Sequence, residues 1–152
     1  MKWVNHEIVT GVIAYTASAD PLLAVCSMIG AIIPDRVEGN PRSSHLFWSW
    51  RSRHRGWSHW PLGYLLIALL VARMTPNLLH PADIGMPHIV FWLCVGALLH
   101  IAEDAVCGKV PLLTPWGKHG IRLFTVGSVT EYLFAISIVL VCYLIHTHFL
   151  VF

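Results

Sequence analysis

Apolar residues fall into five segments that polar loops separate. The segments are residues 8–19, 22–33, 57–74, 88–101 and 132–152. The first two hold about twelve residues each, or ~18 Å of helix, whereas a membrane span needs ~20 apolar residues. They are predicted to form a short N-terminal helical hairpin, which either enters the membrane or packs against the other helices. The other segments predict about three transmembrane helices, of which 132–152 is the clearest.

The composition indicates a membrane protein. Of the 152 residues, 56% are hydrophobic and 12% are charged, roughly half of the ~25% charged residues in a typical soluble domain. The chain shows no internal repeat and is short enough to form a single domain, residues 1–152. The predicted fold class is therefore all-α, an integral membrane helical bundle with the lipid bilayer as its partner.

Three further features narrow the class. The formal net charge is +2, and no basic run is long enough to indicate a nucleic-acid partner. The four cysteines are scattered without a CxxC spacing, which favours buried free thiols. The first apolar segment lacks a clear small-residue cleavage site, so the N-terminus is predicted to be retained.

The basic residues predict the orientation. Residues 36–55 carry five arginines, residues 107–127 carry three basic side chains, and the turn at residues 75–87 carries none. By the positive-inside rule the first two loops are cytoplasmic and the turn lies outside. We expect a multi-pass membrane protein with its N-terminus inside and its C-terminus outside. Arginines retained for substrate binding would distort this count.

Ionisable residues gather at one end of the predicted bundle. On this topology, the residues at the cytoplasmic ends of their segments are His6, Asp35, His54, His59, His100, Glu103, Asp104 and Glu131. Those at the opposite end are His80, His88, His146 and His148. Because ionisable groups are costly in a bilayer, such a cluster beside membrane segments is a candidate functional site.

The spacing of His100 and Asp104 points to metal chemistry. The two residues are four apart, so on a helix they share one face and can both reach one divalent ion. Imidazole and carboxylate without thiolate suit zinc, manganese or iron. Several such ligands can hold one or two ions, which clamp a phosphoryl group and activate water. Arg55, and with it Arg53, would then bind phosphate oxygens.

Other interpretations stay open at this point. A histidine at a helix end is commonly an interfacial residue, and His100 with Asp104 can be a simple hydrogen-bonded pair. The arginines are as well explained as topology determinants as they are as substrate ligands. Glu103 can act as a partner that orients His54 or His59 from outside the ligand set.

Several motifs carry a resemblance to a known family. They are His6, Ile33-Pro34-Asp35, His54-Arg55-Gly56-Trp57-Ser58-His59, Gly96-Ala97-Leu98-Leu99-His100 followed by Asp104, Gly108-Lys109-Val110-Pro111-Leu112-Leu113-Thr114-Pro115, and Gly127-Ser128-Val129-Thr130-Glu131. Together they resemble the bacterial membrane-bound metal-dependent hydrolases described as LexA-regulated. That family is in turn distantly similar to zinc-dependent phospholipases C and P1-type nucleases, which implies a core of that type.

The resemblance implies a location in the bacterial inner (plasma) membrane, a ligand set and a reaction. The implied metal ligands are His6, Asp35, His54, His59, His100 and Asp104. The predicted function is hydrolysis of a phosphoester in a lipid or lipid-linked substrate by metal-activated water, with Asp35 or Asp104 as the catalytic proton acceptor. Glu131 is a possible additional ligand. Two rivals remain, which are a metal-binding or transport protein and a structural membrane protein, neither of them catalytic.

Overall fold

The computed structural model describes residues 1–39 and 55–149, and within them the regular structure is helical apart from one isolated β-bridge between Val110 and His119. The helices are α1 (Trp3–Ser18), α2 (Pro21–Glu38), the 3₁₀ turn η1 (Trp57–His59), α4 (Pro61–Met74), α5 (Met86–Cys107) and α6 (Val129–Phe149). The all-α prediction is therefore confirmed over the described chain.

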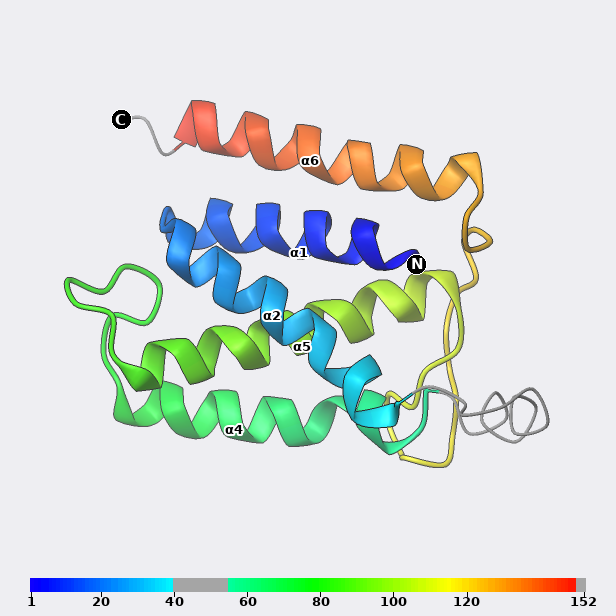
Figure 1. Ribbon diagram of the computed structural model, residues 1–152, viewed down its shortest axis with the longest axis horizontal. Coiled ribbons are helices and arrows are strands. Elements are labelled where there is room, and N and C mark those ends of the chain that lie inside the picture. The colour runs from blue at the N-terminus through cyan, green and yellow to red at the C-terminus, as the bar shows by residue number, and fades with distance from the viewer. Residues whose placement is uncertain (40–54, 150–152) are drawn as a thin grey trace.

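The helices form a bundle in which α1 lies between α6 and α2, and α2 runs diagonally across α5 (Figure 1). Helix α4 packs beside α5 on the far side from α6. The N-terminus, the C-terminal end of α5 and the first turn of α6 lie at the same end of the bundle. The last turn of α2 and the 3₁₀ turn η1 lie at this end of the bundle as well. We call it the site end.

The N-terminal hairpin is longer than its apolar pattern predicts. Helix α1 has 16 residues and α2 has 18. The side chain of Asp20 caps α2 by accepting hydrogen bonds from the backbone N–H groups of Leu22 and Leu23. The predicted end at Pro34 is wrong, because this proline lies inside α2. Proline lacks a backbone N–H and its ring crowds the carbonyl four residues earlier, yet the helix continues to Glu38, with Asp35 in its last turn.

Among the described residues, two helices and not the predicted three are long and apolar enough to span a membrane. They are Met86–Cys107, with 22 residues, and Val129–His148, with 20. The predicted third span at residues 57–74 is wrong, because the helix starts only at Pro61 and has 14 residues, or ~21 Å against a hydrocarbon core of ~30 Å. Residues 57–59 are used by the 3₁₀ turn, which directs His59 into the bundle.

Helices α2 and α5 cross at glycines. A Cβ atom added to Gly30 would lie 2.1 Å from the carbonyl oxygen of Leu93, and one added to Gly96 would lie 1.8 Å from that of Ser27. The Ser27 hydroxyl donates a hydrogen bond to the carbonyl of Trp92 across the same contact, at 3.0 Å. Small residues let the two backbones touch, as is typical of helix packing in membranes.

Replacing Gly96 by alanine should force α2 and α5 apart. The new methyl group meets backbone atoms that cannot move alone, so we expect the free energy of unfolding to fall by about 1–3 kcal/mol, the usual cost of overpacking. Thermal unfolding in detergent, followed by circular dichroism, measures the change.

Gly63 on α4 provides the matched control, since a Cβ atom there has nothing within 4 Å. Gly63→Ala should leave stability unchanged or raise it by up to about 1 kcal/mol through helix propensity. Equal melting temperatures for the two variants would contradict the tight crossing.

Candidate metal centre

Four elements bring the candidate ligands together at the site end. His6 comes from α1, Asp35 from α2, His59 from η1, and His100 with Asp104 from α5. The three histidines are at most 2% exposed, and Asp104 is also buried. These residues span almost a hundred positions of sequence, so the cluster depends on tertiary packing and not on a local motif.

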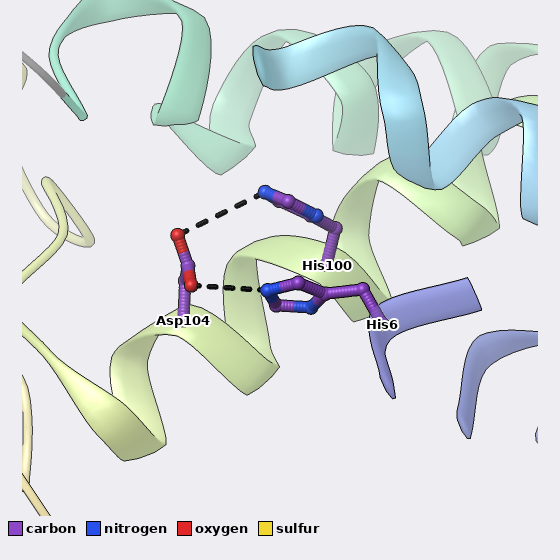
Figure 2. Close-up of side chains that lie close together, drawn as sticks. All are labelled: His6, His100 and Asp104. Atoms are coloured by element: carbon purple, nitrogen blue, oxygen red, sulfur yellow. Dashed lines mark ion pairs between the residues drawn. The ribbon is translucent and has the colours of Figure 1, made fainter. Parts of the chain in front are cut away.

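His6, His100 and Asp104 form one group that can hold an ion (Figure 2). The Nε2 atom of His6 lies 3.3 Å from Oδ1 of Asp104, and the Nε2 atom of His100 lies 3.8 Å from its Oδ2. The two imidazole rings stack at a tilt, with centroids 4.2 Å apart. One ligand atom from each residue lies within 4.8 Å of the others, which is a separation that a single divalent ion can bridge.

Asp35, His59 and His100 form a second group by the same criterion. Oδ1 of Asp35 lies 3.3 Å from Nε2 of His59 and 3.7 Å from Nε2 of His100. Nε2 of His59 also lies 3.6 Å from Oδ2 of Asp104. The groups therefore share His100 and adjoin through Asp104. Asp35 is the ligand closest to the surface, with a side chain 36% exposed.

The residues present fit a metal ion. Both ring nitrogens of His100 are buried, and neither has a hydrogen-bond partner among the residues that the structure describes. Buried polar atoms without partners are rare and costly, and an ion would satisfy at least one of these nitrogens. Three imidazoles and two carboxylates, without a ligand thiolate, form the donor set that zinc, manganese and iron accept.

Glu103 supports the site from outside the two groups. Its Oε2 lies 2.5 Å from Nδ1 of His6, and its Oε1 accepts a hydrogen bond from the Thr10 hydroxyl at 3.2 Å. A carboxylate on the second ring nitrogen fixes the orientation of a ligand histidine. Glu103 was predicted to orient His54 or His59. In the structure it faces α1 and contacts His6 instead of His59. Thr10 was missed, although it follows His6 by four positions on one helix face.

Arg55 lies against Asp104. Its Nη2 atom donates a hydrogen bond to Oδ1 of Asp104 at 2.8 Å, and its Nε atom lies 2.8 Å from Oδ2, within ion-pair distance. The guanidinium passes over Gly108, where an added Cβ atom would lie 2.0 Å from Nη1. Arg55 therefore stabilises the charge of a candidate ligand, and its predicted contact with phosphate stays a prediction.

Glu131 lies apart from both groups. Its side chain is fully buried and accepts hydrogen bonds from the backbone N–H groups of Lys2 and Gly127 and from the amide of Asn5. These bonds tie the start of α1 to the start of α6, so the carboxylate has a structural role here. His54 and Arg53 lie outside the described residues.

The histidines predicted for the opposite end lie there. His80 contacts the carbonyl oxygen of Ser18 at the end of α1, and the ring of His146 packs against Tyr15. The sequence did not predict two contacts to Asp104 at the site end. They come from the Met1 nitrogen, at 3.1 Å, and from the thiol of Cys107. Neither residue type in isolation indicates such a contact.

Two candidate ligands outside the spans have shifted pKa values. Burial, the largest influence, raises the pKa of Asp35, but the neighbouring imidazoles of His100 and His59 outweigh it and hold the pKa well below its ordinary range. Burial lowers the pKa of His6, yet Asp104 and Glu103 together leave it above its ordinary value. Asp35 is thus ionised, as a ligand must be, and an ion that binds His6 displaces its proton.

The fold and the cluster define a class, an all-helical membrane protein with buried histidines and carboxylates at one end of its bundle. The model of the YdjM inner membrane protein family matches residues 1–151. The chain belongs to this family. No curated protein and no solved structure matches the chain, so the likeness to phospholipase C and P1 nuclease stays a prediction.

The contact between Arg55 and Asp104 should depend on the fact that Gly108 has no side chain, which leaves room for the guanidinium. Gly108 has an extended backbone that alanine also adopts, so Gly108→Ala should act by displacing the guanidinium. We expect Gly108→Ala and Arg55→Gln each to destabilise the protein by about 1–3 kcal/mol, the range for hydrogen bonds to charged groups.

A double-mutant cycle measures the link. If both substitutions break the same ion pair, the double variant should be more stable than the sum of the single effects predicts, by about 1 kcal/mol or more. Strictly additive unfolding free energies would show that the two residues act separately.

Proposed function

We propose that the protein is a membrane-bound metal-dependent hydrolase that cleaves a phosphoester of a lipid or lipid-linked substrate. One observation carries the proposal: the two ring nitrogens of His100 are buried and have no hydrogen-bond partner in the described part of the chain, and they lie at the junction of two groups of histidines and carboxylates. The resemblance of the motifs to LexA-regulated metal-dependent hydrolases adds the reaction class, and regulation by LexA belongs to the same proposal.

The ligands proposed are His6, Asp35, His59, His100 and Asp104, with His54 as a sixth. Zinc suits this set best, with manganese or iron as alternatives. Both groups approach the same Nε2 atom of His100, which favours one ion in this part of the site, and a second ion would need further ligands such as His54. When bound, such an ion supplies a Lewis acid and lowers the pKa of water.

The protein's own residues have distinct tasks in this proposal. Asp35 is partly exposed at the mouth of the site, where water reaches it, so of the two predicted proton acceptors it is the one assigned this task. Asp104 is buried and paired with Arg55, so its task is to hold the histidines in place. Glu103 fixes His6, which leaves the Nε2 atom of that ring directed toward Asp104.

A lipid phosphate suits the position of the site. The chain is of an inner membrane family, and the cluster lies at one end of its two candidate spans. Head groups of lipids occupy that depth. We place the site end on the cytoplasmic side because the arginine-rich loop begins there, and labelling of an added cysteine from either side of the membrane tests this orientation.

His100→Ala should abolish metal binding because His100 belongs to both groups. We expect about one equivalent of zinc, manganese or iron in the detergent-purified protein and less than a tenth of that in the variant, measured by elemental analysis. His88→Ala, which removes an imidazole from the opposite end of the same helix, should keep its metal. Metal-free wild-type protein that takes up no ion on reconstitution would sink the metal centre and favour the structural role.

Asp35→Asn should reduce hydrolysis more than it reduces metal content. A side chain that transfers a proton in the transition state contributes roughly 10²–10⁴-fold to rate, so we expect at least a ~100-fold loss in kcat on the best substrate of a phospholipid and phosphodiester screen. Asp20→Asn, at the cap of α2 far from the site end, is the control. If the metal-loaded protein hydrolyses none of the screened phospholipids and phosphodiesters, the metal-binding or transport role would be favoured.

A further inference from the structure

A cavity of about 550 Å³ opens beside Asp35 at the site end. It lies between the start of α1 and the end of α2, and the described residues that line it are Met1, Trp3, Asp35, Arg36 and Gly39. Among these, Asp35 is a carboxylate of the candidate metal centre, whereas Arg36 and Trp3 belong to neither ligand group.

Arg36 is available to a ligand. Its guanidinium lies over the ring of Trp3, 5.5 Å from the ring centre, a cation–π contact that restrains it without occupying its N–H donors. Within the described parts of the chain, no carboxylate lies within ion-pair distance of it. Arg55 differs, because its Nη2 atom donates a hydrogen bond to Asp104 and its Nε atom lies 2.8 Å from the other oxygen of that carboxylate. Of these two arginines, Arg36 is the one with donors to spare.

Asp35 links the cavity to the metal centre. Its Oδ1 atom approaches His59 and His100 inside the bundle, while the residue also lines the cavity. An ionised carboxylate at this wall repels an anion. A divalent ion held by Asp35, His59 and His100 would reverse the local charge, so the cavity would accept an anion when the metal centre is loaded.

We propose that this cavity binds the phosphate group of the substrate, with Arg36 as its hydrogen-bond donor and Trp3 as the surface that holds Arg36 in place. The inference rests on the proposed function, in which Asp35 helps to hold an ion. A planar guanidinium matches phosphate oxygens in a bidentate manner. Trp3 is 45% exposed at the end of the bundle, where indole rings settle at the level of lipid head groups.

Calorimetric titration of the zinc-loaded protein in detergent tests the proposal without any turnover. Inorganic phosphate and the short-chain lipid dihexanoylphosphatidic acid are the two probes. Arg36→Gln should weaken the binding of both roughly 10- to 100-fold, the range for losing charge-assisted hydrogen bonds, with zinc content unchanged. Arg73→Gln, the same charge change in the last turn of α4, should bind both as the wild type does. Tighter binding of the lipid assigns the cavity to a head group, and equal or tighter binding of phosphate assigns it to the free ion.

Two outcomes would overturn this inference without overturning the proposed function. One is wild-type affinity for both probes in Arg36→Gln, and the other is zinc-loaded wild-type protein that binds neither probe. Both outcomes leave hydrolysis and metal content as separate measurements. Wild-type protein that holds no metal would overturn the proposed function and, with it, this inference.

Discussion

The close crossing of α2 and α5 determines where the site residues lie. Gly30 and Gly96 bring the two backbones into direct contact. Asp35 follows Gly30 by five residues and His100 follows Gly96 by four, so the same contact places the carboxylate of α2 against the imidazole of α5. A side chain at either glycine would separate these ligands by changing the distance between the helices, although it touches neither of them.

Burial decides between two explanations of the histidines. Interfacial histidines are solvated by water and head groups, whereas His6, His59 and His100 are almost fully enclosed. A simple hydrogen-bonded pair does not account for His100 either, because Asp104 is beyond hydrogen-bond distance and neither ring nitrogen has a hydrogen-bond partner among the described residues. Under the proposed function, these enclosed polar atoms are retained because they bind an ion.

The sequence predicts which residues meet better than it predicts how they meet. The separation of ionisable residues into two ends follows from apolar segment lengths alone, and the His100–Asp104 pair follows from helical periodicity. The partners of Glu103 and Arg55 do not follow from the sequence. They depend on which helices face each other and on the space that Gly108, which has no side chain, leaves for Arg55. Pro34 misled because a proline favours a helix end on average, whereas α2 continues past it to Glu38.

Because Arg55 is paired with Asp104, it is weaker evidence for the membrane orientation, but the predicted orientation stays the same. An arginine paired with Asp104 is explained by that contact, so it is not free evidence of a cytoplasmic loop. The phosphate contact proposed for Arg36 would remove that arginine from the count as well. Setting both aside still leaves Arg42, Arg51 and Arg53 in the first loop and three basic residues in the second, against Arg73 alone beside the opposite turn. The charge asymmetry that orients a membrane protein is counted over short loops like these, so it persists after the residues used by the site are removed.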